Sequence, residues 1–475
     1  MIESFFSSFG IAGLLYLLLQ LLVTVHILLK KEDVKSAIGW LGLIWLAPLL
    51  GNALYILFGI NRIHRKARHL RRKTTPLKAW SQQKLRQAEK SFPPYALQFL
   101  RLGYQVHPQH FTLGNQITPF INGDEAYPAM CRLIQSARKE VLLQSYIFNN
   151  DAAGQMFLAA LREALANGAR VKIMVDGVGL NYAKTPITQA LQKLPGAEWA
   201  VFLPSRKPAD LPFVNLRNHR KMLLVDGQTA FFGGMNISQD NLLKTHPQSP
   251  VADVTFQVSG PVVEQMAQVF EEDWIFCGKE PFTPAAYTPR PLETSGSAAR
   301  ILPDGPDGDY GKVLMLLLGV LSCAQKSVQI VTPYFLPEND ILNALEVAAM
   351  RGVNIEIILP QKSNIWGMDQ AMRANFERLL SHSIKIYRTP PPFDHSKIVL
   401  VDDAWLFVGS ANWDVRSFKL NFECNMECMD LELARRVGKI IRHKKETARM
   451  EIYPLQRSWW KHLTDNAWRL LTPYY

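Results

Sequence analysis

Two stretches of the chain repeat the same set of chemically active residues. Residues 219–236 read HRKMLLVDGQTAFFGGMN, and residues 395–412 read HSKIVLVDDAWLFVGSAN. Each stretch begins with a histidine, which is followed by a lysine at +2, an aspartate at +7, a glycine at +14 and an asparagine at +17. Because strand side chains alternate, each histidine should share a strand face with its lysine. Two imidazoles and two ammonium groups suit an anionic phosphorus centre, where one histidine attacks and the other protonates the leaving oxygen.

The elements around these stretches are repeated as well. The segment SARKEV (136–141) leads into an apolar strand, a helix ending at Gly168 and a second apolar strand. The segment CAQKSV (323–328) leads into the same order, with the helix ending at Gly352. Continuous apolar strands separated by helices predict an α/β fold of two homologous halves, each a mainly parallel sheet flanked by helices. Two such halves related by a pseudo-twofold axis would bring both histidines into one cleft.

The first 60 residues differ in character from the rest of the chain. From 4 to 29 only His26 can carry a charge, and no residue between 37 and 60 is charged. Each stretch is long enough to cross a hydrocarbon core of roughly 30 Å, with Pro48 kinking the second. A transmembrane helical hairpin is therefore expected. Lysines in its turn and the basic run after it favour a cytoplasmic catalytic body.

The charge of the chain is concentrated in one place. The formal net charge is +12, and eight Lys or Arg and no acid lie between Arg62 and Lys78. Such a run can bind nucleic acid or an anionic membrane, and its position beside apolar segments favours the membrane. The five cysteines form no CxxC pair, so reduced and mostly buried thiols are expected, with no metal and no cofactor.

These features predict a division of the chain into five parts. They are two transmembrane helices (1–60), a basic juxtamembrane linker (61–110), a first half (111–280), a proline-rich linker (281–300) and a second half (301–475). The last stretch, SWWKHLTDNAWRLLTPYY (458–475), fits either a helix resting on the membrane or a helix packed against the core.

The repeated motifs resemble the HKD motifs of the phospholipase D superfamily. The apolar N-terminal spans, TPYFLP (332–337), GGMN (233–236) and GSANWDVRSFKLNFE (409–423) look like the bacterial cardiolipin synthases. The resemblance covers nearly the whole chain. It implies a phosphatidyl transferase of the bacterial inner membrane that joins two phosphatidylglycerol molecules into cardiolipin and releases glycerol. Partners would be phosphatidylglycerol and other anionic lipids, with no nucleic acid; the sequence does not predict an oligomeric state.

The resemblance also assigns roles to the matched residues. The catalytic set is His219, Lys221, Asp226, His395, Lys397 and Asp402. His219 would carry a phosphatidyl-histidine and His395 would act as acid and base, although the reverse order stays open. The lysines, with Asn236 and Asn412, would donate hydrogen bonds to the phosphoryl oxygens. The two aspartates lie where a strand should turn, which favours a structural role.

Residues beyond the motifs complete the predicted site. Asp253 and Glu423 are candidates to hold the second ring nitrogen of a histidine. Tyr146 and Tyr334 lie near strand ends, where they would line the cleft or pack in the core. Asp394, just before His395, departs from the apolar residue usual in the superfamily. If Asp394 approached the cleft it would favour a protonated His395, but the strand alternation predicts that it points away.

Three other activities are compatible with the same motifs. A phospholipase D-like hydrolase, or a synthase that uses another lipid donor, would employ the same two histidines. A nuclease would too, but the apolar N-terminal spans and the lack of an aromatic and basic platform argue against it.

Overall fold

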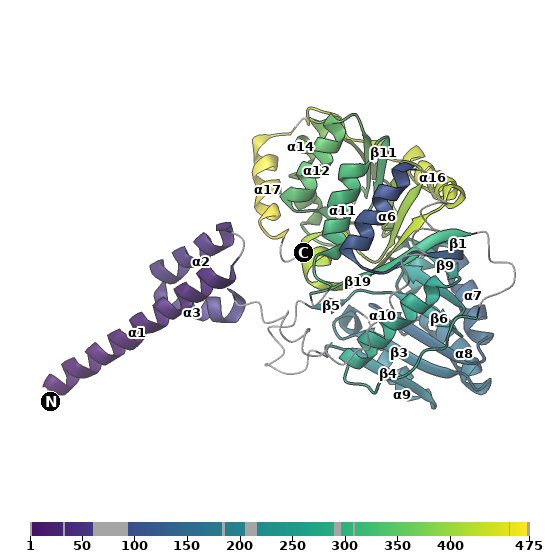
Figure 1. Ribbon diagram of the computed structural model, residues 1–475, viewed down its shortest axis with the longest axis horizontal. Coiled ribbons are helices and arrows are strands. Elements are labelled where there is room, and N and C mark those ends of the chain that lie inside the picture. Colours follow the sequence, from purple (N-terminus) through teal and green to yellow (C-terminus); the bar gives the residue numbers. More distant parts are fainter. Residues whose placement is uncertain are drawn as a thin grey trace. The chain divides into compact units, whose positions relative to one another are not determined.

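The structure is a computed structural model that describes residues 2–31, 34–59, 94–182, 186–204, 216–288, 296–306, 309–455 and 457–472 (Figure 1). The chain divides into an N-terminal unit and a larger unit that contains both motifs. The predicted basic run, Arg62 to Lys78, lies outside the described residues.

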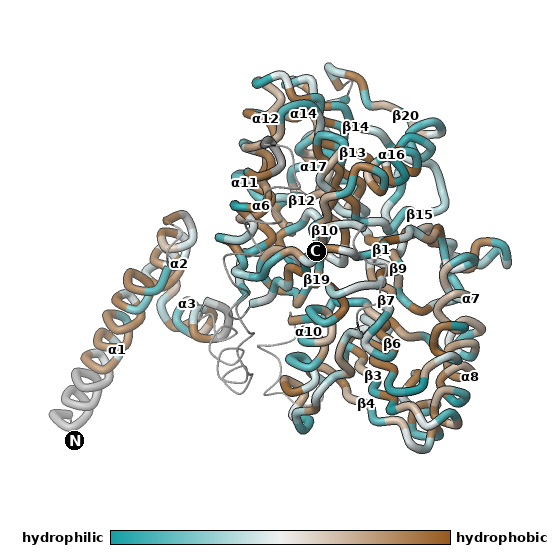
Figure 2. The backbone as a smooth tube through the Cα atoms, turned by 45° about the vertical axis from the view of Figure 1, so that its right-hand side comes forward, coloured by the Kyte–Doolittle hydropathy of each residue, from teal (hydrophilic) through white to brown (hydrophobic). Residues whose placement is uncertain are grey.

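The N-terminal unit consists of a long apolar helix and a shorter segment that folds back on it. Its elements are α1 (Ile2–Lys30), α2 (Val34–Leu46), α3 (Pro48–Leu54) and a π-helical turn, η1 (Tyr55–Gly59). Among the described residues one helix, over Gly13–Lys30, is long and apolar enough to cross a membrane. Figure 2 shows α1 as predominantly hydrophobic along this stretch.

The second apolar stretch is not one continuous helix. It breaks at Ala47 because Pro48 has no N–H to donate and restricts the residue before it, which adopts φ −132° and ψ 70°. Polar contacts tie the segment to α1: Asn52 Nδ2 donates to Gln20 Oε1 at 2.6 Å, and His26 Nδ1 lies 2.8 Å from the Tyr55 hydroxyl. Paired polar groups of this kind are favourable where the surroundings are apolar.

The larger unit is built on one 16-stranded sheet. Its path is β20-β14-β13-β11-β16-β17-β19-β10-β1-β9-β7-β6-β2-β3-β4, and β5 pairs with β19 off this path. Reading outward from the central β1–β10 pair, each strand as far as β4 and β14 has a counterpart in the other half, and β20 is an additional edge strand of the second half. The order is therefore symmetric about that pair. In Figure 1, β1 and β19 lie between the two halves.

The strands of the first half are β1 (Thr112–Ile121), β2 (Glu140–Ser145), β3 (Arg170–Asp176), β4 (Ala197–Phe202), β5 (Arg217–Asn218), β6 (Met222–Val225), β7 (Thr229–Gly233), β8 (Val251–Ala252) and β9 (Val254–Ser259). Those of the second half are β10 (Ser297–Asp304), β11 (Ser327–Val331), β12 (Phe335–Leu336), β13 (Asn354–Pro360), β14 (Lys385–Thr389), β15 (Phe393–Asp394), β16 (Ile398–Val401), β17 (Trp405–Gly409), β18 (Trp413–Asp414), β19 (Asn421–Met429) and β20 (Arg449–Met450).

The helices of the larger unit are α6 (Pro94–Val106), α7 (Asn122–Gln135), α8 (Ala152–Ala166), α9 (Ile187–Gln192), α10 (Val262–Phe276), α11 (Lys312–Cys323), α12 (Asn339–Met350), α13 (Met368–Arg373), α14 (Phe376–Leu380), α15 (Val415–Lys419), α16 (Leu431–Glu446) and α17 (Trp459–Arg469). Three 3₁₀ turns are η2 (Gly179–Tyr182), η4 (Gln239–Asn241) and η5 (Leu243–Thr245).

The prediction of mainly parallel sheets was wrong, because the sheet is mixed. The parallel sets along the path are β2-β3-β4 and β11-β13-β14, and off the path β5 pairs parallel with β19. Along the path β6, β7 and β9, and their counterparts β16, β17 and β19, pair antiparallel. The hairpin strands β6–β7 and β16–β17 are buried along their whole length. Helices cover both of their faces, so they show the continuous apolar pattern that is usual for parallel strands.

The predicted linker boundaries also differ from the observed elements. Helix α6 lies inside the predicted basic linker (61–110), yet its Phe99 and Leu100 are buried in the core of the second half. The sequence prediction followed the preceding charge and overlooked an amphipathic helix. Strand β10 likewise begins at Ser297, before the predicted end of the proline-rich linker.

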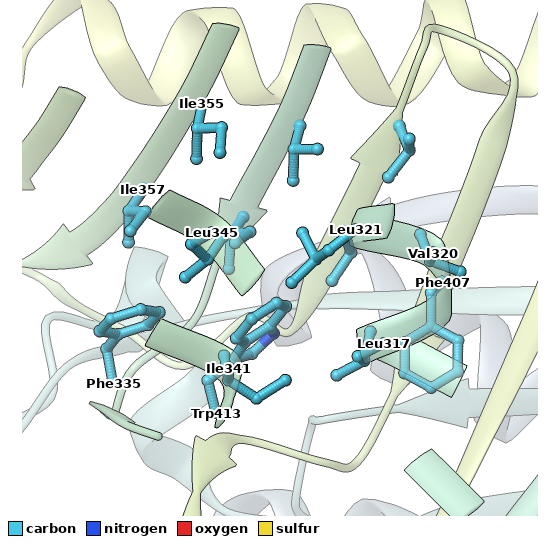
Figure 3. Close-up of a cluster of buried hydrophobic side chains, with 14 of the residues drawn as sticks. Leu317, Val320, Leu321, Phe335, Ile341, Leu345, Ile355, Ile357, Phe407 and Trp413 are labelled. Atoms are coloured by element: carbon cyan, nitrogen blue, oxygen red, sulfur yellow. The ribbon is translucent and has the colours of Figure 1, made fainter. Parts of the chain in front are cut away.

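Three apolar clusters hold the larger unit together. One lies under α7, α8 and α9 in the first half, and another under α6, α11 and α12 in the second. Figure 3 shows the second, where side chains of α11 and α12 point toward Ile355 and Ile357 of β13. The third, under α10 and α16, includes residues of both halves, so the halves share one hydrophobic core.

Candidate active site

Two short strands cross from one half to the other immediately before the motif histidines. Strand β5 pairs with β19, which places Asn218 opposite Phe422, and the His219 N–H donates to the Phe422 carbonyl at 2.9 Å. Strand β15 pairs with β8 in the same way, and the His395 N–H donates to the Ala252 carbonyl at 2.7 Å. Each histidine is therefore fixed by the backbone of the opposite half.

This crossed pairing brings a carboxylate of the other half to each imidazole. The residue after Phe422 is Glu423, and His219 Nδ1 lies 3.1 Å from both Glu423 carboxylate oxygens. The residue after Ala252 is Asp253, and His395 Nδ1 lies 3.1 Å from Asp253 Oδ2. With Nδ1–H directed at a carboxylate, the remaining ring nitrogen of each histidine can act as nucleophile or base.

The two carboxylates are held differently. Glu423 accepts from the hydroxyl groups of Ser410 and Ser417 and from Asn421 Nδ2, in addition to His219. Asp253 accepts from the Val254 N–H at 2.8 Å through its other oxygen. The neighbouring imidazole and hydrogen bonds, together with Lys221, outweigh burial and hold the pKa of Glu423 at about 2.

Both imidazoles are neutral at pH 7. Burial, which disfavours the charged ring, lowers the pKa of His219 and of His395 to about 4. The adjacent ammonium groups, Lys221 for His219 and Lys397 for His395, act in the same direction, while the carboxylates oppose them. A site at rest with two neutral imidazoles has two competent nucleophiles and awaits a proton for the acid.

Each lysine lies beside the histidine of its own motif, and its ammonium group binds the backbone carbonyl of that histidine. Lys221 Nζ donates to the carbonyl oxygen of His219 at 2.5 Å, and Lys397 Nζ donates to that of His395 at 2.6 Å. Burial lowers the pKa of Lys397 to about 8 and that of Lys221 well below its usual range. The stretches 219–221 and 395–397 are extended junctions between two strands rather than strand residues, in contrast to the sequence prediction.

Both histidines line one cavity of about 580 Å³. Tyr146 and Tyr334 line it as well, each with its ring edge-on to a histidine; the ring centroids are 5.1 Å apart for Tyr146 and His219 and 6.3 Å for Tyr334 and His395. The volume is sufficient for a phosphodiester headgroup with part of its glycerol backbone. Both imidazoles therefore border the same space.

Asn236 and Asn412 also line this cavity. Asn236 Oδ1 accepts from the Ile147 N–H at 3.2 Å, so this side chain has a positioning contact and its amide nitrogen remains as a donor. Asn412 Oδ1 is buried without a hydrogen-bond partner among the described residues. A buried unsatisfied amide oxygen is costly unless a ligand supplies a donor, such as a glycerol hydroxyl.

The comparisons with known proteins agree with this geometry. The family described as "Cardiolipin synthase, PLD-like domain" matches residues 130–274 and 317–444. The chain belongs to this family. It is 31% identical to "Cardiolipin synthase 1" of Bacillus anthracis, over 88% of this chain and 85% of the relative. It is 29% identical to "Cardiolipin synthase A" of Pseudomonas fluorescens (strain SBW25), over 88% of each chain.

A solved structure shows that the fold is shared more widely. The phosphatidylserine synthase of Haemophilus influenzae Rd KW20 superposes with a TM-score of 0.62, over 80% of this chain and 98% of its own, at 15% sequence identity. The cardiolipin synthase family thus has a fold that persists at low sequence identity.

The motif aspartates of this cardiolipin synthase family member do not reach the cavity. Asp226 accepts from the backbone N–H groups of residues 138–140, and Asp402 accepts from those of residues 325–327. Both have positive φ, 54° and 52°, at the turn after β6 and β16. This position outside the cavity does not support a direct catalytic role for either aspartate. The alternative interpretation, a role in holding the backbone, agrees with the contacts.

Asp394 points away from the cavity. It pairs with Lys444 of α16 at 2.5 Å and accepts from the N–H and hydroxyl of Ser396. Burial raises the pKa of Asp394, but Lys444 and Ser396 more than offset this, so the pKa lies below its usual range.

The first half has an equivalent network with the charges exchanged. Asn218 and Arg220, which flank His219, both contact Asp273 of α10, at 2.8 and 2.6 Å. A buried acid is paired with a cation in both networks, and Asp394 acts on the site from outside the cavity by opposing the fall in the pKa of Lys397 that burial causes.

Sequence reasoning missed several residues of the site. Ser410 and Ser417 contact Glu423, and the cavity is also lined by Arg217, Arg416 and Asp414. Ser410 follows Gly409 at the position that Gly234 has in the first motif, so the difference GGMN against GSAN was a detectable signal. A Cβ at Gly234 would lie 3.1 Å from Asp253 Oδ2, closer than most Cβ contacts, so a side chain there would crowd that carboxylate.

Proposed function

We propose that this protein transfers a phosphatidyl group from one phosphatidylglycerol to another, forming cardiolipin and glycerol. Membership of the family supports this activity. The main structural support is a single cavity lined by two imidazoles, each of which is bound through Nδ1 to a carboxylate of the opposite half.

The first step forms a bond between His219 Nε2 and phosphorus. The bond from phosphorus to the glycerol oxygen breaks, and His395 gives its Nε2 proton to that oxygen, so that glycerol leaves and a phosphatidyl-histidine remains. The assignment of His219 as nucleophile follows the order usual in the superfamily. Its support here is the fully hydrogen-bonded Glu423, which stabilises positive charge on the ring.

In the second step the bond between phosphorus and His219 breaks, and a new bond from phosphorus to oxygen forms. His395, now neutral, takes the proton of the terminal hydroxyl of a second phosphatidylglycerol. The hydroxyl oxygen attacks phosphorus and the bond from phosphorus to His219 breaks, which gives cardiolipin, a neutral His219 and a protonated His395 ready for the next first step. Lipid alcohols reach the intermediate before water if the cavity opens to lipid headgroups, which is why transfer prevails over hydrolysis in this scheme.

Binding of the lipid lets His395 take up from solvent the proton that the first step needs. The phosphodiester carries one negative charge, and an anion beside His395 raises the pKa of its imidazole from about 4. Lys221 and Lys397 provide positive potential at the phosphoryl oxygens, and each ammonium has donors beyond the one that binds a backbone carbonyl. Asn236 adds an amide donor, and the buried oxygen of Asn412 would accept from a hydroxyl of the lipid.

The N-terminal unit would anchor the enzyme to the inner membrane. In this proposal α1 spans the bilayer and the segment from α2 to η1 forms the second arm of a hairpin. The Gln20–Asn52 contact supports the hairpin, since a buried polar pair stabilises helix association in lipid. The lysines in the turn and the basic run after the hairpin favour a cytoplasmic catalytic body.

Turnover of a labelled substrate tests the proposal. Purified full-length protein in vesicles with headgroup-labelled and phosphorus-labelled phosphatidylglycerol should release glycerol and form cardiolipin in equal amounts. His219→Ala and His395→Ala should each lower kcat by at least about 10³-fold. Formation of phosphatidic acid alone would show a hydrolase, and cleavage of nucleic acid without lipid turnover would show a nuclease; either result contradicts the proposal.

A substrate with an activated leaving group tests the covalent step. Phosphatidyl p-nitrophenol needs no acid for departure, so His395→Ala should still form the phosphatidyl-histidine but fail to resolve it. Phosphorus label should therefore stay on the chain in His395→Ala and be absent in His219→Ala. The opposite pattern would exchange the two roles, and no label in either variant would remove the covalent intermediate.

A further inference from the structure

The C-terminal helix α17 presents an apolar stripe to solvent and buries Asp465 against the protein. Trp459, Trp460, Leu463 and Leu470 are 61%, 61%, 52% and 77% exposed. At 100° per residue these side chains, with Ala467, fall within a sector of roughly 100°. A helix that serves only to cover a core has the reverse arrangement.

The inward side of α17 is fixed by charge. Asp465 is only 4% exposed and lies 2.7 Å from Arg457 and 3.6 Å from Arg373 of α13. Trp468 packs against the core of the second half, with its ring 4.2 Å from that of Trp366. These contacts set the rotation of the helix, so the apolar stripe is held outward rather than left there by a loose fit.

Neighbouring segments extend the same surface. Trp366 is 81% exposed, Ile452 72% and Tyr453 52%. A second cavity, of about 780 Å³, opens beside them and is lined by the cations Arg373, Arg449, Arg457 and Lys461, with Glu451 and Asp465 as its acids. Exposed tryptophan with lysine and arginine is the composition of segments that lie at a membrane interface.

The surface adjoins residues that line the active cavity. Trp366 lies between Ile365 and Met368, and both of these line the cavity that holds the two histidines. The segment 365–373 therefore forms a wall that has the active cavity on one side and contacts α17 on the other.

We propose that this surface, defined by Trp366, residues 449–455 and α17, docks the active cavity onto an anionic bilayer. The exposed tryptophan and leucine side chains enter the interface, and the cations around the second cavity hold lipid phosphates. Charge complementarity favours this occupant, because the surface has an excess of cations around its apolar stripe and the proposed substrate is an anionic lipid. The inference rests on the proposed function for the identity of that lipid, but the docking itself does not require turnover.

Fluorescence quenching tests the docking without using catalysis. The full chain would be placed in phosphatidylglycerol vesicles whose acyl chains carry bromine, which quenches tryptophan at the depth of the chains. Trp459→Phe/Trp460→Phe should lose a measurable part of the quenchable fluorescence. The matched control is Trp199→Phe, a partly buried tryptophan of β4 in the first half, which should leave the quenchable fraction unchanged. Equal quenching in wild type and the double variant overturns the proposal.

Activity in two lipid environments tests the consequence. Trp459→Ala/Trp460→Ala and Lys461→Glu/Arg469→Glu should raise the apparent KM for phosphatidylglycerol in vesicles by about tenfold while kcat in mixed detergent micelles stays within about twofold. The loss in Lys461→Glu/Arg469→Glu should shrink as salt increases. Equal losses in vesicles and micelles overturn the proposal. The proposal is also overturned if either variant has half the mass of the wild-type protein in solution while its quenching is unchanged. That result would show that a second copy of the chain covers the apolar stripe. If cardiolipin formation fails but quenching changes as expected, the docking stands and the proposed function falls.

Discussion

At the residue scale, the two histidines are equivalent in sequence but differ in what holds their carboxylates. Glu423 is bound by three side chains besides His219, whereas Asp253 has a backbone N–H besides His395. The hydrogen bonds to Glu423 fix its carboxylate in a single position. The ring of His219 is thereby oriented more tightly than that of His395, which suits a nucleophile that must align with phosphorus.

Glu423→Gln should lower kcat by about 10–100-fold, because the amide neither fixes the tautomer of His219 nor stabilises positive charge on its ring. The pKa of His219 should fall further below about 4, since Glu423 raises it. Steady-state turnover at neutral pH measures the loss of kcat, and NMR titration of the His219 ring below about pH 5 measures the change in its pKa. Ser417→Ala removes one donor to the same carboxylate and should change kcat less than about threefold; a larger loss there than in Glu423→Gln would contradict this account.

The depressed histidine pKa values also predict how stability depends on pH. His219 and His395 have pKa values of about 4 when folded and about 6.5 when unfolded, so the unfolded chain binds more protons between these values. Stability is therefore lost as the pH falls through this window, by on the order of 2 kcal/mol per histidine at pH 5. Asp176 and Asp414, whose pKa values burial raises to about 6, oppose the trend.

A comparison of variants isolates the histidine contribution. His219→Gln/His395→Gln keeps the two aspartates but has no imidazole to protonate. Thermal unfolding in detergent at pH 8 and pH 5 should show a smaller loss of stability in this variant than in wild type. An equal loss in both proteins would mean that the histidines are not buried as neutral rings.

Much of the site could be predicted from the sequence, and the reason is the duplication. His219 and His395 with their lysines are marked by repeated spacing, and both histidines do line one cavity. The pairing of each histidine with the carboxylate of the other half could not be predicted, because it depends on the two-residue strands β5 and β15. Such strands leave no periodic pattern in a sequence.

At the element scale, the turns after β6 and β16 show how an acidic residue of a catalytic motif can serve the backbone. The carboxylate of Asp402 accepts three backbone N–H groups at the start of β11. It thereby ties the turn that ends the motif strand to the neighbouring strand. Strand β16, which follows His395, is thereby stabilised at the end opposite to the histidine.

Asp402→Asn should lower the free energy of unfolding by about 1–3 kcal/mol, because an amide nitrogen, which cannot accept a hydrogen bond, replaces one of the two accepting carboxylate oxygens. The turnover of the folded variant should remain within about threefold of wild type.

Asp403→Asn is the matched control: Asp403 is exposed, has a similar φ of 53° in the same turn, and should change stability by less than about 0.5 kcal/mol. Denaturant titration and initial rates at low temperature measure the two quantities. A large loss of kcat in folded Asp402→Asn would restore the catalytic interpretation.

The arrangement of the sheet was predicted less well than its elements. The order of strand, helix and strand in each half was predictable from the apolar runs and from Gly168 and Gly352. The direction of β6 and β7 was not, because burial on both faces removes the alternation that usually marks antiparallel strands. Helix α6 was missed because the basic run before it suggested a linker.

At the scale of the whole molecule, one chain contains every residue of the site. Both histidines line the same cavity, and both carboxylates come from the same chain. Mixing inactive His219→Ala with inactive His395→Ala should therefore leave cardiolipin formation at the background of each variant. If subunits exchanged these residues, mixing would restore up to about a quarter of wild-type activity in a dimer. A tandem fusion of the two variants that stays inactive would exclude slow exchange as the reason.

The crossed strands β5 and β15 make the two halves mutually dependent. A half separated from its sister would have an imidazole whose partner acid was missing, and an acid with nothing to orient. Any ancestor with a single half would have needed to pair with a copy of itself to work. After the duplication, each half still had to supply its histidine and its carboxylate to the shared site. The linker between the halves replaced the association of two chains with an intramolecular contact.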